Sequence, residues 1–391
     1  WELSLASAHQ TTLRNRPRPW LINHLRMAYK VIISGGGTGG HIFPAIAIAN
    51  EIKRLHPDTT FLFVGANGKM EMEKVPNAGY EIIGLNITGI KRSLSLSNLK
   101  FPFRLIGSLA KAKKIIKDFN PNVVVGVGGY ASGPVLRMAT WMKVPTLIQE
   151  QNSFAGVTNR WVANAVSKVC VAYDNMDRFF PKDRIVITGN PVRSEVVAID
   201  GKREKALSHF GLEQNKPILL IIGGSLGARS VNLAMKEGVS RVLEAGIQVL
   251  WQTGKLFKDE TAELERSVNS PSLRMTEFIF EMDLAYAVAD VVVSRAGAIA
   301  VSELSIVGKP TILVPFPFAA EDHQTQNALS LVNTGAAIMI PDKEVSQNLV
   351  DQALDLLGDD ERKSTLSANI VKHGHPNAAN QIACEVISLA S

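Results

Sequence analysis

The sequence predicts an α/β protein made of two similar halves, each built around a parallel β-sheet. Short β-branched runs alternate with helical patterns along the chain. Glycine-rich loops follow several of these runs, and the whole pattern restarts at Lys216. With 391 residues, the chain is long enough for about two domains of ordinary size.

The composition is that of a globular protein, with 46% hydrophobic and 20% charged residues. No apolar run reaches the ~18 residues that a membrane-spanning helix needs. Cys170 and Cys384 lie far apart and form no Cys-x-x-Cys pair, so we expect a reducing compartment and no metal bound by cysteine. The net charge of +6 suits nucleic acid, anionic lipid or an acidic substrate and does not choose among them.

The first half is predicted to span residues 27–192. Its strands are expected in the runs "KVIIS", "FLFVG", "NVVVGVGGYASGP", "VPTLIQEQN", "KVCVAY" and "RIVITGNPVR", and a helix follows the first run to about Leu55. Residues 1–26 contain several arginines but lack the apolar core of a secretory signal. We expect them to be a disordered or non-native extension, with a functional basic arm as the alternative.

The second half is predicted to span residues 193–375, after the Gly, Asn and Pro of "TGNPVR". Its strands are expected in "KPILLIIGGSLGARSVN", "IQVLWQTG", "RMTEFIF", "ADVVVSRAGAIAVSEL" and "KPTILVPFP". Residues 376–391 are predicted to form a helix that packs back on the first half. Two Rossmann-like halves separated by a cleft would bind a ligand at the carboxyl ends of both sheets.

Three strand-to-helix loops are rich in glycine, at residues 35–40, 126–129 and 223–227. Such loops expose backbone N–H groups at a helix N-terminus and favour a phosphate. The alternative for each is a tight turn that packs a helix on a strand. The spacing Gly35-x-Gly37-x-x-Gly40 also fits a dinucleotide fingerprint, but "FLFVG" is followed by Ala66 and Asn67 instead of the acid that a ribose needs.

No glycine-lysine pair is followed by Ser or Thr, so a Walker loop is absent, and no Asp-x-Asp could hold a metal on a diphosphate. We therefore expect no cofactor and no metal.

Glu303 follows the glycine turn of "SRAGAIAVSEL", where a carboxylate could accept both ribose hydroxyls, and Gln324 follows nearby. The alternative for Glu303 is a surface helix carboxylate. These residues alone indicate a nucleotide-binding α/β enzyme.

Seven segments, in order, resemble the motifs of the peptidoglycan glycosyltransferases that make lipid II, in glycosyltransferase family 28. They are "GGGTGGHIFPA", "GVGGYASGP", "QEQNSFAGVTNR", "TGNPVR", "GGSLGARSVN", "SRAGAIAVSEL" and "HQTQNA", and the likeness runs from about Met27 to the C-terminus. The motifs are similar to those of the undecaprenyldiphospho-muramoylpentapeptide β-N-acetylglucosaminyltransferases. The resemblance implies the two-domain GT-B fold, UDP-N-acetylglucosamine (UDP-GlcNAc) as donor, inversion at the anomeric carbon and lipid I as acceptor.

The resemblance also implies a site. The residues expected to bind UDP-GlcNAc are Thr38, Gly39, Gly40, Asn152, Arg193, Ser225, Ile279, Ala298, Ile299, Ala300, Val301, Ser302, Glu303 and Gln324. Ser225 is expected at a helix N-terminus, Ile279 to present backbone to uracil, and Glu303 to hold the ribose. Related sequences often carry threonine in place of Ala300, so there only backbone contact is expected.

The acceptor diphosphate is expected at the first two glycine loops, on Gly37, Gly128, Gly129 and Tyr130. His41 would deprotonate the acceptor hydroxyl, because an unperturbed imidazole titrates near ~6.5. The alternative is that His41 only caps or packs the start of its helix. A related transferase with another acceptor and a non-catalytic binding protein for nucleotide sugars or anionic lipids also remain open, while an NAD-dependent oxidoreductase is disfavoured.

Residues 91–117 contain eight basic residues, no acidic residue and interleaved Leu, Ile and Phe side chains. This pattern suits the anionic surface of a membrane, where a polyprenyl-linked acceptor resides. The alternative is an ordinary helix with solvated lysines. We expect a peripheral protein on the cytoplasmic face of the bacterial plasma (inner) membrane, with other cell-wall synthesis proteins as further partners and no nucleic acid.

Overall fold

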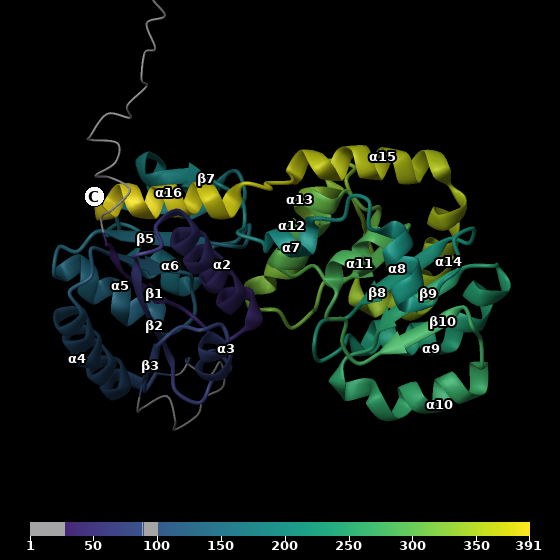
Figure 1. Cartoon of the computed structure of the whole chain (residues 1–391), viewed down its shortest axis with the longest axis horizontal. Helices are drawn as coiled ribbons and strands as arrows, with labels where there is room; N and C mark the ends of the chain where they lie inside the picture. The colour runs from purple at the N-terminus through teal and green to yellow at the C-terminus, as the bar shows by residue number, and fades with distance from the viewer. Residues whose placement is uncertain (1–27, 88, 90–100) are drawn as a thin grey trace, which may run out of the picture.

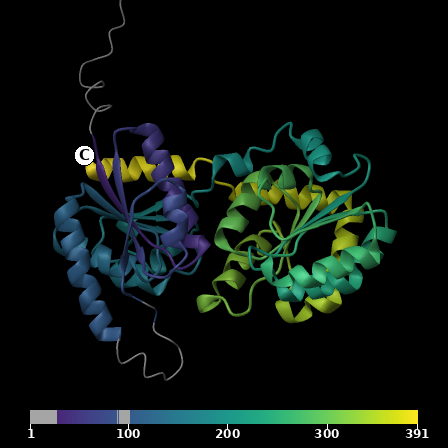
Figure 2. The same ribbon diagram turned by 60° about the horizontal axis from the view of Figure 1, so that its bottom comes forward.

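The computed structural model describes residues 28–87, 89 and 101–391, which fold into two α/β domains (Figure 1). Each domain has a parallel sheet between layers of helices, as a second view also shows (Figure 2). The prediction of two parallel-sheet halves is therefore confirmed. The predicted extension at residues 1–26 lies outside the described residues.

The first sheet has seven parallel strands in the order β3-β2-β1-β4-β5-β6-β7. The strands are β1 (Lys30–Ser34), β2 (Thr60–Ala66), β3 (Ile82–Leu85), β4 (Val123–Gly126), β5 (Thr146–Glu150), β6 (Lys168–Val171) and β7 (Ile185–Ile187). The helices of this domain are α2 (Gly39–Leu55), α3 (Glu71–Asn77), α4 (Phe101–Phe119), α5 (Ser132–Trp141), α6 (Val157–Val162), η2 (Met176–Arg178) and η3 (Lys182–Arg184).

The second sheet has six parallel strands in the order β10-β9-β8-β11-β12-β13. The strands are β8 (Ile218–Ile222), β9 (Gln248–Gln252), β10 (Leu273–Thr276), β11 (Val291–Ser294), β12 (Thr311–Leu313) and β13 (Ile338–Met339). The helices that follow β7 in the chain are α7 (Ser194–Val197), α8 (Arg203–Phe210), α9 (Arg229–Glu244), η4 (Lys255–Phe257), α10 (Lys258–Val268), α11 (Met282–Val288), α12 (Ala298–Val307), η5 (Ala320–Asp322), α13 (His323–Val332), η6 (Asp342–Glu344), α14 (Val345–Gly358), α15 (Asp360–Ile370), η7 (Val371–His373) and α16 (Ala378–Ala390).

Three elements differ from the expectation. The edge strands β3 and β13 were not predicted. Both are short, and the first two residues of β3 and both residues of β13 are only partly buried, so they form no clear apolar run. The strand expected over "RMTEFIF" ends at Thr276. Beyond it, the Ile279 N–H donates to Gln252 Oε1 at 3.0 Å, while Phe280 is 79% exposed.

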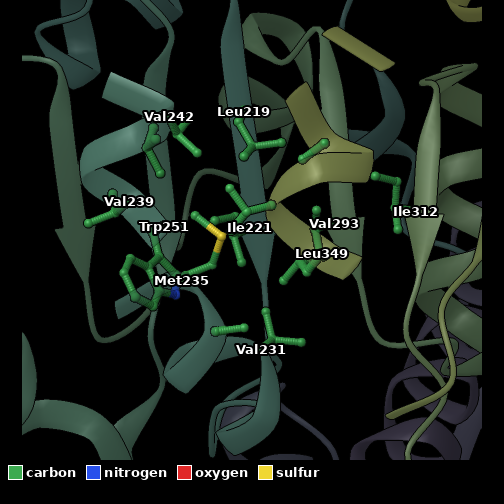
Figure 3. Close-up of a cluster of buried hydrophobic side chains, with 14 of the residues drawn as sticks. Leu219, Ile221, Val231, Met235, Val239, Val242, Trp251, Val293, Ile312 and Leu349 are labelled. Atoms are coloured by element: carbon green, nitrogen blue, oxygen red, sulfur yellow. The ribbon is translucent and has the colours of Figure 1, made fainter. Parts of the chain in front are cut away.

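Each sheet has a hydrophobic core on both faces, because successive strand residues point to opposite sides. Leu219 and Ile221 of β8 pack with Met235 of α9 and Leu349 of α14 on one face (Figure 3). Leu220 lies between them in sequence and packs in the cluster on the other face. A strand buried on both sides explains the unbroken apolar run at residues 218–222.

The last helix returns to the first domain, where it lies alongside α2 (Figure 1). Ile382, Ala383 and Val386 of α16 are buried in the core cluster of that domain. Asn380 donates to Glu51 at 2.9 Å, and Lys168 pairs with Glu385. The chain therefore crosses between the domains twice, at residues 188–193 and 374–377.

The strand order reverses between β1 and β4 in the first sheet, and between β8 and β11 in the second. At such switch points, the loops leave to opposite faces of the sheet and ligands bind between them. The glycine loops singled out in the sequence all follow one of these four strands. Within the described residues, no helix combines the length and apolar character that crossing a bilayer requires.

Candidate donor and acceptor site

The first two glycine loops contact each other closely. A Cβ atom added to Gly35 would lie 2.2 Å from Val127 Cγ2, and one on Gly129 would lie 2.3 Å from the Gly36 carbonyl oxygen. Gly129 also has a φ of 84°, which favours glycine. Packing of one loop on the other thus accounts for Gly35 and Gly129. Gly37 differs, because a Cβ added there would meet nothing within 4 Å.

A buried carboxylate holds the first loop in place. Glu71, at the start of α3, is only 1% exposed. Its Oε2 accepts the Gly37 N–H at 2.8 Å, and its Oε1 accepts the Ala66 N–H at 2.9 Å. Glu71 was missed in the sequence, where an acid at the start of a polar helix has the pattern of a surface residue.

His41, in the first turn of α2, lies between the two loops. Its Nδ1 is 3.1 Å from the Gly36 carbonyl oxygen, which can only accept, so Nδ1 carries the proton in the neutral ring. Nε2 then has a free lone pair, and it faces Gly128, where an added Cβ would lie 2.8 Å away. Burial lowers the pKa of His41, although the bond to Gly36 opposes this shift. The imidazole is therefore neutral at pH 7.

The N-terminus of α2 is free of side-chain caps and of acidic residues in its first turn. Thr38 is the N-cap residue, yet its hydroxyl lies 3.4 Å from His41 Nδ1 instead of capping the helix. Gly39 and Gly40 form the first turn, where backbone N–H groups have no helical partner. This end of α2 is electrostatically suited to an anion. Tyr130, after the second loop, is 54% exposed.

On the second domain, the expected donor residues of α12 separate by burial. Ala298 and Val301 are 8% and 2% exposed, and Val301 packs in the core cluster of this domain, so their side chains offer little surface to a donor. Ile299, Ala300 and Glu303 are partly exposed. Ser302 accepts a hydrogen bond from Asn190 Nδ2 at 2.9 Å, and so faces the first interdomain crossing.

Glu303 is part of a charged cluster instead of being a free surface carboxylate. It accepts a hydrogen bond from the Tyr286 hydroxyl at 2.9 Å. Burial raises the pKa of Glu303, while the Tyr286 bond and the charge of Arg193 oppose the rise. Arg193 also lies 5.7 Å from the ring centroid of Phe43 on α2. Arg193 therefore connects α2 of the first domain with the donor side of α12.

Ser225 lies in a turn, not at the helix N-terminus where it was expected. The helix α9 begins at Arg229, because Gly224 and Gly227 adopt φ values of 77° and 85° and close a turn between them. The Gly227 N–H donates to the Gly224 carbonyl at 3.1 Å. Ser225 is exposed on this turn, and a Cβ on Gly224 would meet nothing within 4 Å.

Two further residues that were expected to bind the donor are partly engaged within the protein. The backbone N–H of Ile279 donates to Gln252, so only its carbonyl oxygen is left for the expected contact to uracil. Gln324 Oε1 accepts the Phe316 N–H at 2.9 Å, so the amide NH₂ group remains available as a donor. Tyr286, which contacts Glu303, was missed because its surroundings in sequence have the pattern of a core helix.

Asn152 lies at the contact between the domains. Its Oδ1 accepts from Asn327 Nδ2 at 3.3 Å, and Asn327 Oδ1 accepts the Ser153 N–H at 3.1 Å. The loop that carries Asn152 is ordered by Glu150, which is 1% exposed and accepts from Asn159 at 2.8 Å. Burial raises the pKa of Glu150.

Among the described residues, no group of three or more His, Cys, Asp or Glu side chains could hold a metal ion.

The two parallel sheets with glycine loops at their switch points define the two-domain GT-B fold, and the family of the chain assigns it to the glycosyltransferases. The glycosyltransferase family 28 N-terminal domain matches residues 31–171, and the family 28 C-terminal domain matches residues 218–382. The chain therefore belongs to glycosyltransferase family 28.

Two relatives are similar over nearly their whole length. Both are UDP-N-acetylglucosamine--N-acetylmuramyl-(pentapeptide) pyrophosphoryl-undecaprenol N-acetylglucosamine transferases. The protein from Cytophaga hutchinsonii is 53% identical over 92% of this chain and 97% of its own. The protein from Parabacteroides distasonis is 50% identical over 92% of this chain and 98% of its own. The crystal structure of Acinetobacter baumannii MurG matches with a TM-score of 0.75 and 27% identity, covering 92% of this chain and 99% of that one.

Proposed function

We propose that the protein transfers N-acetylglucosamine from UDP-GlcNAc to the muramoyl 4-hydroxyl of undecaprenyl-pyrophosphoryl-MurNAc-pentapeptide (lipid I), which gives lipid II for peptidoglycan synthesis. The observation that carries the proposal is the similarity to the named transferases across both domains, at 53% identity for the Cytophaga hutchinsonii protein. The donor half and the acceptor half are both covered by it.

The second domain binds the donor in this proposal. Glu303 accepts the ribose hydroxyls, the Ile279 carbonyl faces uracil, and the Gln324 amide donates to the sugar. Arg193 and the turn at Ser225 offset the negative charge that grows on UDP as it leaves. The positive charge of Arg193 is already directed at this cluster, where it opposes the pKa rise of Glu303.

The first domain binds the acceptor and activates its hydroxyl. The diphosphate of lipid I lies on the open side of Gly37 and on the Gly128–Tyr130 loop. The 4-hydroxyl attacks the anomeric carbon, the bond from this carbon to the UDP oxygen breaks, and His41 Nε2 accepts the hydroxyl proton. This role needs a neutral imidazole, which burial of His41 favours.

The assay that tests the function is UDP release on mixing UDP-GlcNAc with lipid I. We expect release that depends on both substrates, with lipid II as the product. Release with another lipid acceptor but not with lipid I would point to a related transferase. Binding of UDP-GlcNAc without release on any acceptor would indicate a non-catalytic protein, and either result would refute the proposal.

Replacing Glu303 tests the donor site. A hydrogen bond to a charged group contributes roughly 1.5–3 kcal/mol, so Glu303→Ala should raise the KM for UDP-GlcNAc by about 10- to 100-fold. Burial raises the pKa of Glu303, so its carboxylate protonates at a higher pH than an ordinary glutamate does. As the pH is lowered, the wild-type protein should therefore lose donor affinity before an ordinary glutamate would begin to protonate. Glu265→Ala, on the exposed side of α10, is the control. A folded Glu303→Ala protein with wild-type donor affinity would exclude Glu303 from the site.

Replacing His41 tests the base. His41→Ala should lower kcat by about 100-fold or more, while UDP still binds. Because the neutral imidazole is active and its pKa is lowered, the acid limb of the wild-type pH profile should lie below ~6.5 and disappear in the variant. His209→Ala, which removes a half-exposed histidine of α8, should be silent. A decrease of only a few fold in His41→Ala would assign the base to another residue.

The acceptor chain makes membrane contact necessary, and α4 provides a surface for it. Phe103 and Ile106 are 78% and 64% exposed, and Trp141 of α5 is 66% exposed. Lys113 Nζ lies 4.5 Å from the centroid of the Trp141 ring. Part of the predicted basic stretch, at residues 91–100, lies outside the described residues. We infer peripheral attachment of this surface to the cytoplasmic face of the plasma (inner) membrane, where other cell-wall synthesis proteins would meet the enzyme.

Not every side chain of this stretch is available to lipid. Lys111 Nζ donates to the Gly84 carbonyl at 2.7 Å and anchors α4 to β3. Leu105 packs against the core cluster of the first domain. The lipid-facing set is therefore reduced to the exposed aromatic and aliphatic side chains and the neighbouring lysines at positions 113 and 114.

Vesicle binding tests this surface. The protein should sediment with anionic vesicles and be released by salt, since each basic residue contributes up to ~1 kcal/mol that is screened over about 8 Å. The pairs Phe103→Ser with Ile106→Ser, and Lys113→Glu with Lys114→Glu, should each abolish binding but preserve activity on a soluble short-chain acceptor. Leu256→Ser and Lys343→Glu are the controls in the other domain. Leu256 is 75% exposed, and the side chain of Lys343 is 83% exposed. Equal binding to neutral and anionic vesicles would contradict the inference.

A further inference from the structure

A pocket lies where the chain crosses between the domains. Its volume is about 550 Å³, which is within the usual range for small-molecule sites, and both domains line it. The two crossings touch there, because a Cβ added to Gly189 would lie 2.2 Å from His375 Cβ. Gly189 has a φ of 81°, so this contact depends on glycine.

The charged groups that line this pocket are mostly cationic. Arg178 of η2 comes from the first domain, and Lys372 of η7 comes from the second. His373 and His375 follow Lys372 in the chain, while Asp174 is the one carboxylate among the described lining residues. Arg178 donates to the Ser153 carbonyl at 2.9 Å and lies 4.7 Å from the Phe179 ring centroid, and Lys372 donates to Asn369 Oδ1 at 2.8 Å. A guanidinium and an ammonium group have further N–H donors to offer an anion.

A buried hydroxyl also indicates that this pocket binds a ligand. The Tyr173 hydroxyl is buried beside Ser330, and among the described residues it completes no hydrogen bond of good geometry. Such a group costs free energy unless water or a ligand binds it. Ile187 also lines the pocket and is 50% exposed, so an apolar wall lies next to the polar groups.

The helix α12 connects this pocket to the donor site. Ser302, Ser305 and Ile306 line the pocket, and their spacing places them on one face of the helix. Glu303 and Ala300 lie on another face of the same helix. Ser302 was expected to contact the donor, but it lines this pocket, where its hydroxyl accepts a hydrogen bond from Asn190, another lining residue. An occupant would contact both domains and the helix that carries Glu303.

We propose that this pocket binds a small phosphate-bearing molecule that bridges the two domains at the crossings, separately from the donor and acceptor. Cations from both domains bind the phosphate oxygens, the Tyr173 hydroxyl donates to them, and Ile187 contacts the remainder of the molecule. Bound there, the ligand favours one relative position of the domains.

Calorimetric titration of the full chain with inorganic pyrophosphate tests the proposal, with UDP at saturation so that the donor site is filled. We expect pyrophosphate binding that persists in Tyr130→Ala, which alters the acceptor loop. Lys372→Ala and Tyr173→Phe should each weaken binding by about three- to tenfold, since each removes a hydrogen-bond donor to an anion at a partly solvated site. Lys205→Ala makes the same charge change on the exposed side of α8 and should leave the affinity unchanged.

Tyr130→Ala separates this pocket from the acceptor loop, where a diphosphate is also expected. Pyrophosphate binding that is lost in Tyr130→Ala but retained in Lys372→Ala and Tyr173→Phe would place the anion at the acceptor loop and overturn the proposal. Absence of binding to the UDP-saturated wild type would overturn it as well. Tyr173→Phe removes only a hydroxyl without a good partner, so a loss of folding does not obscure its result.

Discussion

The common direction of the strands is the constraint on which the rest of the structure depends. All strands of a parallel sheet end at the same edge, and the order reverses between β1 and β4 and between β8 and β11. Segments that are remote in sequence, such as residues 35–40 and 126–130, therefore meet at one edge. The proposed acceptor groups and the proposed base come together for this reason, and the turn before α12 has the corresponding place in the second domain.

The contact between the domains is polar and specific. Asn327 of α13 is fully buried, and its amide binds Ser153 and Asn152 of the first domain and the Ala296 carbonyl of the second. Arg160 and Glu321 pair across the same contact at 3.1 Å. A buried amide whose partners come from both domains favours one arrangement over others, because any other arrangement leaves donors and acceptors unpaired. The same contact holds the turn that begins α12.

Two buried glutamates order the loops of the first domain. Glu71 accepts backbone N–H groups from Gly37 in the loop after β1 and from Ala66 at the end of β2, and Glu150 accepts from Asn152, Gly156 and Asn159. A buried carboxylate needs such donors because its desolvation is costly. The positions of Gly37 and Asn152 thus depend on residues that would contact neither substrate. The carboxylate of Glu71 fixes the first glycine loop from the protein side, while the other side of Gly37 stays open. A ligand can therefore bind there without a rearrangement of the loop.

The sequence by itself determined the two parallel sheets, the glycine loops after their strands and the family, because β-branched runs and glycine turns are local signals. It also singled out Glu303 and His41, which lie in those motifs. Tertiary structure decided what surrounds them. Tyr286, Glu71 and the orientation of Ser302 toward Asn190 depend on contacts between segments 17 to 112 residues apart, and local patterns carry no record of such contacts. Likewise, the pocket at the crossings exists only because residues 188–193 and 374–377 are brought together, since the last helix packs on the first domain.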